Sequence, residues 1–559
     1  MIQPSYSRGR QDKALLAQTI GQAFDETVAK FPLGEALVVR HQQLRYSWAQ
    51  LGEAVDLHAR ALMALGLRTG DRLGVWAPNC AQWCITQFAS AKLGVILVNI
   101  NPAYRTSELE YVLKQSGCQW LICAGAFKTS NYHAMCATLV PELCDYPAGQ
   151  LRSESLPELR GVISLDEQPP AGFLPWSALA SLAVEVSVEQ LNERQRCLQF
   201  DHPVNIQYTS GTTGFPKGAT LSHYNILNNG YMVGESLSLS AADRVVIPVP
   251  LYHCFGMVMG NLGCMTHGAT MIYPNDGFDP LLTLRVVAEE RATALYGVPT
   301  MFIAMLDHPQ LKAFDLSSLR TGIMAGATCP IEVMRKVISE MHMKEVQIAY
   351  GMTETSPVSL QTGPEDGIEL RVTTVGLTQP QLENKIIDET GCVVPRGQIG
   401  ELCTRGYSVM LGYWNNPQGT AEALDQAGWM HTGDLASMDD NGYVCIAGRN
   451  KDMIIRGGEN VYPRELEEFF FTHPAVADVQ VIGIPDTRYG EEIVAWIKLH
   501  PGHVVSALEL QGWCKDRIAH YKTPRHFKFV DEFPMTVTGK VQKFRMREIS
   551  VEELLKAVE

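Results

Sequence analysis

The stretch Tyr208–Gly218, with the sequence YTSGTTGFPKG, combines glycines, hydroxyl side chains and a lysine within eleven residues. Glycine accepts positive φ and lets backbone N–H groups approach an anion, while hydroxyls and an ammonium group add further donors. This composition suits a loop that binds phosphate groups. The spacing differs from the P-loop pattern G-x-x-x-x-G-K-[ST], because Gly214 lies three residues before Lys217. Taken alone, the stretch is also compatible with an exposed turn.

Three other positions carry residues suited to chemistry. Glu354 follows the strand pattern EVQIAYG, at the carboxyl end where open α/β sheets place their ligands. Carboxylate oxygens bind Mg²⁺, and the carboxylate of Asp434, in HTGD, can accept hydrogen bonds from a vicinal diol. Lys540, in TVTGK, can supply a cation. Considered singly, these residues also fit a loop carboxylate, a turn former and a surface lysine, so their assignment depends on context.

The elements that must position these residues begin with alternating helix and strand patterns. Up to about residue 125, helical patterns such as residues 47–65 alternate with short apolar runs such as RLGVWAP. This alternation predicts parallel sheets flanked by helices. Residues 127–175 are predicted to form an irregular excursion between layers. The alternation resumes at VNIQYT, which leads directly into the glycine-rich stretch.

The remaining chain changes character twice. From about Thr374, short strands alternate with turns, which predicts a smaller β-rich unit. The last 110 residues predict a compact α+β unit whose first helix begins at Pro463. A capping box at Ser506 and Glu509 predicts a further helix, whose periodic pattern continues to Tyr521.

Six motifs, taken in order, resemble the adenylate-forming superfamily of AMP-binding enzymes, which includes acyl- and aryl-CoA synthetases, peptide-synthetase adenylation domains and beetle luciferases. They are YTSGTTGFPKG, YGMTE, GELCTRGYSVMLGYW, GWMHTGD, GRNKDMIIRGGENVYP and TVTGKVQK, and they extend over nearly the whole chain. The resemblance implies a large N-terminal domain, residues 1–450, with two parallel-type α/β layers and a small β-rich subdomain. It also implies a small, mobile α+β C-terminal domain, residues 451–559, with a hinge near Lys451.

The implied reaction has two halves and uses ATP, Mg²⁺ and coenzyme A. A carboxylate attacks the α-phosphorus of ATP and releases pyrophosphate, and the thiol of coenzyme A then displaces AMP. Because the first half brings two anions together, a cation must lie between them. The resemblance assigns that cation to Lys540, the α-phosphate contact to Thr353 and the Mg²⁺ ligand to Glu354. The implied ATP-binding residues are Thr209, Ser210, Gly211, Thr212, Thr213, Gly214, Phe215, Pro216, Lys217, Tyr350, Thr353, Asp434 and Arg449 on the ribose or phosphate side, and Lys540.

A narrower resemblance, to medium-chain fatty acid:CoA ligases, is carried by ATLSHYNILNNG, PLYHCFG and YGVPTMF. It implies an acyl site formed by His253, Phe255, Val298, Ala325, Gly326, Ala327 and Gly351. The implied contacts for coenzyme A are Gly457, Gly458 and Glu459. No Lys, Arg, Asp or Glu occurs among the acyl-site residues, so a charged amino-acid substrate is disfavoured. Apolar walls of this kind also occur as ordinary core.

Composition limits the location and the partners. The formal charge of −14 argues against nucleic-acid binding, and no apolar run reaches the length of a membrane span. Fourteen cysteines without a C-x-x-C pair give no metal-ligand spacing and favour reduced thiols in the cytoplasm. The basic start, MIQPSYSRGRQDK, lacks the apolar region of a secretory signal, and a transit peptide remains an alternative. A homo-oligomer is left open.

Other functions share these motifs. An aryl or cinnamate-type acid:CoA ligase, a free-standing adenylation enzyme and a luciferase-type oxidoreductase would each carry the same loop, carboxylates and lysine. From a different class, a non-catalytic nucleotide or acyl-CoA sensor is disfavoured, because the loop, Glu354 and Lys540 are all present. The leading prediction is an AMP-forming acid:CoA ligase that acts on medium-chain fatty acids.

Overall fold

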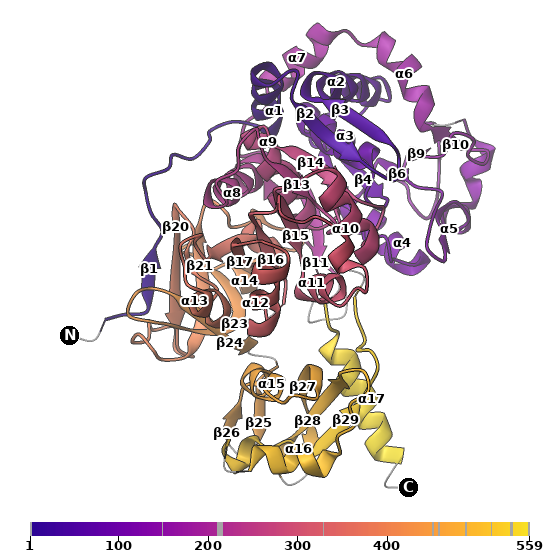
Figure 1. The fold of residues 1–559 in the computed structure, drawn as a ribbon. Helices are drawn as coiled ribbons and strands as arrows, with labels where there is room; N and C mark the ends of the chain where they lie inside the picture. The colour runs from indigo at the N-terminus through magenta and orange to yellow at the C-terminus, as the bar shows by residue number, and fades with distance from the viewer. Residues whose placement is uncertain are drawn as a thin grey trace.

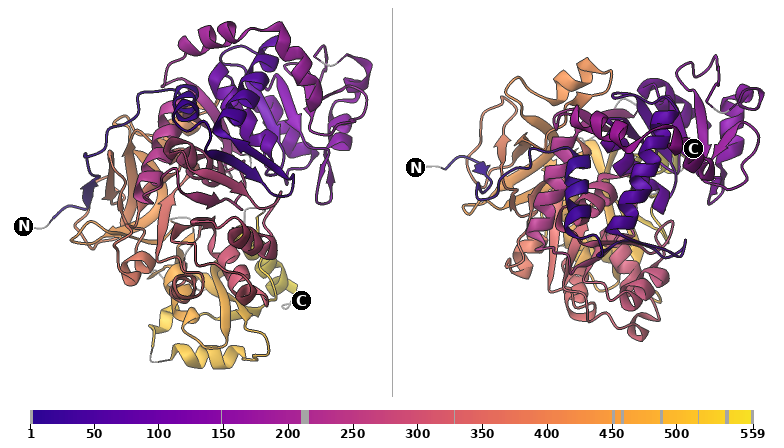
Figure 2. Two further views of the ribbon diagram at one scale, coloured as in Figure 1. Left: turned by 45° about the horizontal axis from the view of Figure 1, so that its top comes forward. Right: turned by 90° about the horizontal axis from the view of Figure 1, so that it is seen from above.

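The computed structural model describes residues 3–147, 149–209, 216–327, 329–449, 452–456, 459–486, 489–515, 517–536 and 540–556. These residues form a large N-terminal domain and a smaller C-terminal domain, which occupies one end of the molecule (Figure 1; Figure 2, left view). The arrangement confirms the predicted α/β class with a large and a small domain. Among the described residues, no helix is both long and apolar enough to cross a bilayer.

The first large sheet carries the glycine-rich stretch. Its eight strands have the order β10-β9-β6-β4-β5-β11-β12-β22, parallel from β10 to β11 and antiparallel from there to β22. The strands are β4 (Arg72–Trp76), β5 (Ile96–Asn99), β6 (Trp120–Cys123), β9 (Gly161–Ser164), β10 (Phe173–Pro175), β11 (Pro203–Thr209), β12 (Lys217–Ser222) and β22 (Gly412–Tyr413). Strands β11 and β12 form the hairpin whose tip is the predicted phosphate loop.

The prediction that residues 127–175 are irregular is wrong. The segment contains helix α5 (Tyr132–Leu139), most of a small hairpin of β7 (Ala126–Phe127) and β8 (Ser130–Asn131), and strands β9 and β10. Strands β9 and β10 extend the parallel sheet. All four residues of β9 are buried, so no alternation of apolar and polar residues marks it in the sequence.

The second large sheet carries Glu354 at the end of one of its strands. Its nine strands have the order β19-β18-β17-β16-β15-β13-β14-β2-β3. The strands are β2 (Glu35–Val39), β3 (Leu44–Ser47), β13 (Arg244–Val246), β14 (Thr270–Tyr273), β15 (Ala294–Gly297), β16 (Thr321–Ala325), β17 (Glu345–Gly351), β18 (Val358–Gln361) and β19 (Leu377–Thr378). The strands from β14 to β17 in this order are parallel. Candidate residues therefore gather where β15, β16 and β17 end.

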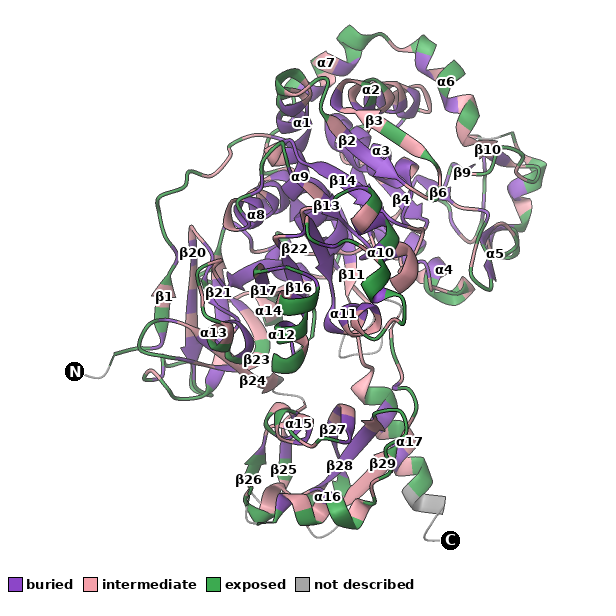
Figure 3. Cartoon of the chain, in the orientation of Figure 1, coloured by how far each residue is buried: buried purple, intermediate pink, exposed green. Residues whose placement is uncertain are grey.

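Helices pack on and between these sheets, and the buried strands and helices form the core of the large domain (Figure 3). Helix α2 begins after Ser47, which forms a capping box with Gln50. Every residue of α3 except Gln82 is buried, as expected for a helix inside a layered core. The helices of this domain are α1 (Ile20–Lys30), α2 (Trp48–Ala64), α3 (Ala81–Leu93), α4 (Thr106–Ser116), α5, α6 (Leu179–Leu182), α7 (Val188–Arg196), α8 (His223–Ser236), the π-helix η4 (Phe255–Leu262), α9 (Gly263–His267), α10 (Pro280–Glu289), α11 (Pro299–Leu306), α12 (Ile331–Glu340), α13 (Ile368–Thr373), α14 (Pro417–Ala423) and the 3₁₀ turn η6 (Thr353–Thr355).

The predicted β-rich unit is a third sheet of the large domain. It has the order β1-β20-β21-β23-β24 and is antiparallel throughout. Its strands are β1 (Tyr6–Arg8), β20 (Leu382–Ile387), β21 (Gly400–Gly406), β23 (Met430–Met438) and β24 (Val444–Arg449). The sequence did not predict β1, since three residues are too few to show a pattern.

The small domain is α+β, as predicted. Its sheet has the order β26-β25-β28-β27, with β29 beside β28. Its elements are β25 (Ile454–Arg456), β26 (Glu459–Val461), α15 (Pro463–Phe471), β27 (Val476–Asp486), β28 (Gly490–Leu499), α16 (Ala507–Cys514), β29 (His526–Phe529) and α17 (Lys543–Lys556).

The capping box at Ser506 is confirmed, but the predicted continuation of that helix to Tyr521 is wrong. Helix α16 ends at Cys514, because Lys515 has extended backbone angles (φ −60°, ψ 131°). The later apolar residues of the pattern, Ile518 and Tyr521, pack against the core of the small domain from a loop and a 3₁₀ turn.

Candidate active site

Glu354 is the buried centre of the polar half of the site. It follows β17 in the turn η6, and its exposed fraction is 5%. Its Oε1 accepts hydrogen bonds from the hydroxyls of Thr209 (3.1 Å) and Tyr413 (2.9 Å). Its backbone carbonyl accepts the Met410 N–H at 2.9 Å. Two segments, one with Thr209 and one with Met410 and Tyr413, therefore hold Glu354 at the root of the glycine-rich hairpin.

The donors around Glu354 suit a hard divalent cation. Among the described residues no lysine or arginine pairs with this carboxylate, and both side-chain partners are neutral hydroxyls. A buried carboxylate without a charged partner is costly, whereas Mg²⁺ prefers carboxylate and other oxygen ligands. The residues present therefore fit the predicted magnesium ligand.

The hairpin flanks lie close to this carboxylate. Thr209 pairs with Lys217 across β11 and β12, and the Lys217 ammonium lies over the Tyr413 ring at 5.1 Å from its centroid. Tyr111 donates its hydroxyl hydrogen to the Pro216 carbonyl at 3.1 Å. The loop residues Ser210, Gly211, Thr212, Thr213, Gly214 and Phe215 lie outside the described residues.

Tyr413 is a site residue to which sequence reasoning assigned no role, although it stands in the quoted motif GELCTRGYSVMLGYW. Its ring contacts the Lys217 ammonium and its hydroxyl donates to Glu354, so it joins the loop lysine to the carboxylate. Burial, followed by the charge of Glu354, raises the pKa of the Tyr413 phenol. It therefore stays protonated and remains a hydrogen-bond donor at neutral pH.

The predicted ribose contact, Asp434, lies on β23 at the edge of the site. Its Oδ2 accepts the Tyr350 hydroxyl at 2.5 Å, and Tyr350 is the penultimate residue of β17. Asp434 also pairs in register with Arg449 on β24; only the backbone of Arg449 is described. The structure thus joins Tyr350 and Asp434, two predicted nucleotide-binding residues that are 84 positions apart in the chain.

Lys540 comes from the small domain and reaches the large one. Its Cε lies 3.6 Å from the position that a Cβ on Gly326 would occupy, at the end of β16. The Lys540 N–H donates to Thr536 Oγ1 (3.0 Å), and the Thr536 N–H donates to the Lys540 carbonyl (2.7 Å). In Figure 1 the chain segments that lead to α17 extend toward the large domain, beside the label of α11.

The predicted acyl residues gather near the same point. Val298, at the start of α11, lies with its Cγ1 3.3 Å from the position that a Cβ on Gly326 would occupy. Burial, followed by the nearby Lys540 charge, lowers the pKa of His253 to about 3, so this imidazole is neutral at pH 7. Phe255 stacks on Tyr296 with ring centroids 5.8 Å apart. Ala325 is buried, whereas Gly326 and Ala327 are exposed at the carboxyl end of β16.

Gly351 is needed for backbone packing. A Cβ at this position would lie 1.7 Å from the Pro357 carbonyl oxygen, so no other residue fits without a rearrangement. It closes β17 directly before the turn that carries Thr353, which is 7% exposed. Gly351 therefore helps to place Thr353 and Glu354, whatever contact it makes with a substrate.

The predicted coenzyme A contacts are only partly described. Glu459 begins β26, is exposed and pairs with Arg456 of β25. Gly457, Gly458 and the predicted hinge Lys451 lie outside the described residues. In Figure 1, β25 and β26 lie on the opposite side of the small domain from β29 and α17. The strand that begins with Glu459 is thus on the side of this domain away from α17, the helix that follows Lys540 in the chain.

The fold and the site define the class of protein. The chain belongs to the AMP-binding enzyme family. The family model described as "AMP-binding enzyme" matches residues 24–414, and the model described as "AMP-binding enzyme C-terminal domain" matches residues 465–540.

Individual relatives cover almost the whole chain. YngI of Bacillus subtilis (strain 168) is 47% identical over 96% of this chain and 98% of its own length. The mitochondrial medium-chain acyl-CoA ligase ACSF2 of Rattus norvegicus is 46% identical over 97% of this chain and 89% of its own. Among solved structures, the anthranilate CoA ligase AuaEII, in complex with anthranoyl-AMP, superposes with a TM-score of 0.81 at 26% identity, covering 96% of this chain and 98% of that one.

Proposed function

We propose that this protein is an AMP-forming acid:CoA ligase that acts on medium-chain fatty acids. The observation that carries the proposal is the meeting of Lys540, from the small domain, with Gly326 and His253 of the large domain. Full-length similarity to relatives named as medium-chain acyl-CoA ligases supports the substrate class. ATP and coenzyme A are the co-substrates that such a ligase uses.

In the first half-reaction, Lys540 neutralises the repulsion between the attacking carboxylate and the α-phosphate. An ammonium group placed between two anions before reaction stabilises the charge that develops as the bond forms. Thr353, at the end of β17, donates to the α-phosphate, and the carboxylate of Asp434 accepts from the ribose hydroxyls. Mg²⁺, held by Glu354, would neutralise charge on the departing pyrophosphate.

In the second half-reaction, the small domain presents a different face. Pyrophosphate must leave and a pantetheine arm must enter, while the reactive adenylate stays protected from water. Rotation near Lys451 would withdraw Lys540 and bring forward the segment that contains Gly457, Gly458 and Glu459. The position of β26 and α17 on opposite sides of the small domain supports this scheme (Figure 1).

The side chains assigned to the acyl site carry no charge. Phe255 and Val298 are buried apolar side chains, and His253 is uncharged at pH 7 because burial lowers its pKa to about 3. An alkyl chain makes no hydrogen bonds, so a wall without charges can bind it without leaving polar groups unpaired. The same wall could accept an aromatic ring, and AuaEII is named as an aryl acid ligase. An aryl acid is therefore the second candidate substrate.

The decisive test separates the half-reactions in the variant Lys540→Ala. We expect ATP–pyrophosphate exchange to fall ~10²–10³-fold, the usual cost of losing one preorganised charge contact. Conversion of pre-formed acyl-adenylate and coenzyme A into thioester should keep close to the wild-type rate. Equal loss in both assays would contradict a scheme in which Lys540 acts only in the first half.

The substrate class is tested with the wild-type enzyme. Pyrophosphate release is measured across straight-chain acids from acetate to palmitate, together with benzoate and cinnamate. We expect a maximum in kcat/KM at medium chain length. A maximum on cinnamate would replace the fatty acid by an aryl acid and would leave the ligase chemistry intact.

Location and assembly remain predictions. The cytoplasmic assignment came from cysteine usage, whereas the ACSF2 relatives are named as mitochondrial. Fractionation of the native cells with an antibody to this chain would distinguish the two compartments. Gel filtration with light scattering would give the oligomeric state.

A further inference from the structure

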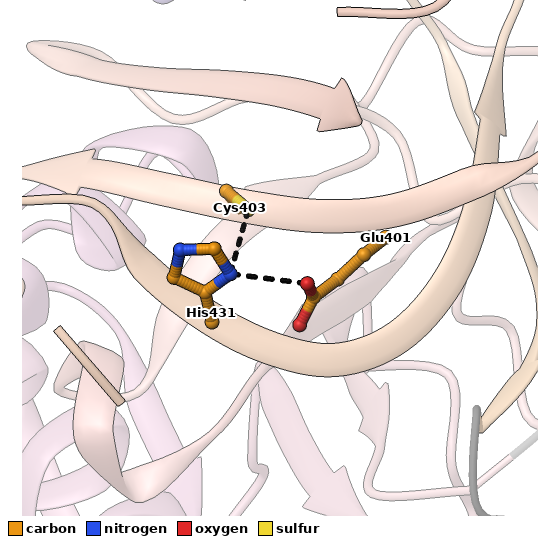
Figure 4. Close-up of side chains that lie close together, drawn as sticks. All are labelled: Glu401, Cys403 and His431. Atoms are coloured by element: carbon orange, nitrogen blue, oxygen red, sulfur yellow. Dashed lines mark hydrogen bonds and ion pairs between the residues drawn. The ribbon is translucent and has the colours of Figure 1, made fainter. Parts of the chain in front are cut away.

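A histidine, a cysteine and a glutamate converge on one face of the β-rich sheet, outside the proposed active site (Figure 4). Glu401 and Cys403 lie two residues apart on β21, so their side chains point to the same face. His431 on β23 is the direct cross-strand partner of Cys403. Sequence reasoning missed this group, because strand pairing rather than a short spacing brings the three side chains together.

The ligand atoms have the separations of a metal's coordination shell. His431 Nδ1 lies 3.0 Å from Glu401 Oε2 and 3.7 Å from Cys403 Sγ, and all three atoms lie within 4.8 Å of one another. In a tetrahedral zinc site with Zn–N, Zn–O and Zn–S bonds of about 2.0–2.3 Å, neighbouring ligand atoms are about 3.3–3.7 Å apart. Side-chain movements of up to about 1 Å would bring all three separations into that range and seat a metal ion in this group.

A backbone hydrogen bond orients Glu401, and an acidic side chain lies behind His431. Glu401 Oε1 accepts the Gly433 N–H at 3.1 Å, which leaves Oε2 directed at the histidine. The far nitrogen of the imidazole, Nε2, lies 4.0 Å from Asp425 Oδ2. In zinc sites a carboxylate that accepts a hydrogen bond from the far nitrogen of a ligating histidine fixes the tautomer. A movement of about 1 Å would let Asp425 accept that bond. The side chains of His431 and Glu401 are 30% and 27% exposed, so an ion can enter from solvent.

We propose that Glu401, Cys403 and His431 form a binding site for a divalent transition-metal ion, best suited to Zn²⁺, with water as the fourth ligand. Thiolate and imidazole ligands select zinc over magnesium, so this site is chemically distinct from the oxygen ligands around Glu354. It does not depend on the proposed reaction. A bound ion would tie β21 to β23 three residues before Asp434, and so would restrain the strand that carries the proposed ribose contact.

The principal alternative is a plain ion pair between Glu401 and His431 with a buried neutral thiol. Burial, followed by the Glu401 charge, raises the pKa of Cys403 to about 12, while Lys385 lowers it. A metal must therefore displace a proton from this thiol, as thiolate ligands generally require. The metal-bound state contains a bond between the Cys403 sulfur and the metal, which the ion pair lacks and which can be measured.

The test uses Co²⁺, which replaces zinc and absorbs strongly when a thiolate binds it. One equivalent of Co²⁺ is added to the tag-free full-length protein in excess Mg²⁺, and the thiolate-to-metal charge-transfer band is recorded. We expect the band in the wild type and in the control Cys392→Ser, which removes an exposed thiol of the same subdomain. The band should be absent in Cys403→Ser and in the other ligand variants.

A second ligand variant guards against misfolding of Cys403→Ser. In His431→Gln the side-chain amide can still donate to Glu401 but offers no imidazole nitrogen, and circular dichroism checks that it folds. Asp425→Asn, which keeps the oxygen that accepts the Ala427 and Trp429 N–H groups, should weaken Co²⁺ binding about 10- to 100-fold. A wild type without the band, or a band that persists in Cys403→Ser or in folded His431→Gln, would overturn the assignment.

Discussion

Glu354 in the large domain and Lys540 in the small domain serve the same proposed reaction but are held in different ways. Glu354 is 5% exposed and is fixed by the hydroxyls of Thr209 and Tyr413 and by a backbone hydrogen bond from Met410. Lys540 is half-buried, its backbone N–H donates to the Thr536 hydroxyl oxygen, and its carbonyl accepts the Thr536 N–H. The Glu354 carboxylate is thus fixed within the large domain, whereas the small domain brings the Lys540 ammonium group to it.

This difference suits a reaction with two halves. Groups that bind the nucleotide are needed throughout, so their fixed geometry is an advantage. A group that acts only in the first half must also be able to leave. The contrast predicts that substitutions near Glu354 impair both halves through nucleotide binding, whereas substitutions near Lys540 impair the first half selectively.

The largest effect is expected for Glu354→Gln. The amide keeps an oxygen that can accept from Thr209 and Tyr413, so the fold should survive while the charge that would hold Mg²⁺ is lost. We expect ATP–pyrophosphate exchange to fall ~10²–10³-fold, with a large rise in the Mg²⁺ concentration required. Exchange rates measured across Mg²⁺ concentrations check this. An unchanged Mg²⁺ dependence would show that the ion is bound elsewhere.

A smaller effect is expected for Tyr413→Phe. It removes one hydrogen bond to a carboxylate, worth about 1.5–3 kcal/mol, and leaves the ring beneath Lys217 in place. We expect a loss of ~10-fold or more in adenylation and a raised Mg²⁺ requirement, measured by the same exchange assay.

A matched control exists for this change. Tyr443 donates to Asp366 at 2.6 Å, a phenol–carboxylate pair away from the site, so Tyr443→Phe removes the same chemistry without touching Glu354. Equal activity loss in both variants would mean that Tyr413 acts only through stability.

The sequence predicted roles for residues that stand in motifs but not for a residue whose role depends on a distant partner. Glu354, Asp434 and Lys540 were proposed as site residues because they stand in motifs, and the structure places Asp434 against Tyr350 and Lys540 against Gly326. Tyr413 was missed because its role depends on a partner 59 residues away in the chain. Such partnerships are set by how distant segments pack together, which a local pattern does not contain.

The fold shows the same limit. The alternation of strands and helices predicted the parallel sheets and the small domain, since their periods are local properties. It did not predict the short strands β9 and β10, nor the end of α16 at Cys514. A helical spacing does not by itself fix the helix end, since Ile518 and Tyr521 fit the pattern but pack on the core from a loop and a 3₁₀ turn.

A modest and selective effect is expected for Thr536→Val. The change keeps the shape of the side chain and removes the oxygen that accepts the Lys540 N–H, a contact worth about 0.5–1.5 kcal/mol. We expect adenylation to fall a few-fold and thioester formation from pre-formed adenylate to be unchanged. Thr472→Val, which removes a hydroxyl bonded to the Phe469 carbonyl in the same domain, is the control. An equal loss of rate in both half-reactions would contradict a selective role for the contact between Thr536 and Lys540.

The smallest effect concerns the pH dependence of stability, which should differ between the domains. In the large domain, the hydrogen bond from Arg45 lowers the pKa of Glu290 to about 2. In the small domain, burial raises the pKa of Asp478 to about 6. A lowered carboxyl pKa stabilises the folded state above the unfolded value of about 4, whereas a raised one costs stability as pH rises from about 4 to 6.

Asp478→Asn should therefore stabilise the small domain at pH 8 and have little effect at pH 4. The amide keeps the oxygen that accepts the Val479 N–H, so only the cost of a charged group in a partly buried place is removed. Because the side chain is partly exposed, we expect a gain of about 1 kcal/mol, measured by scanning calorimetry at the two pH values. Glu290→Gln should act in the opposite sense, with a loss at pH 8 that shrinks as the pH falls toward 2. A shift of stability in the same direction for both variants at pH 8 would contradict the opposite pKa shifts of Glu290 and Asp478.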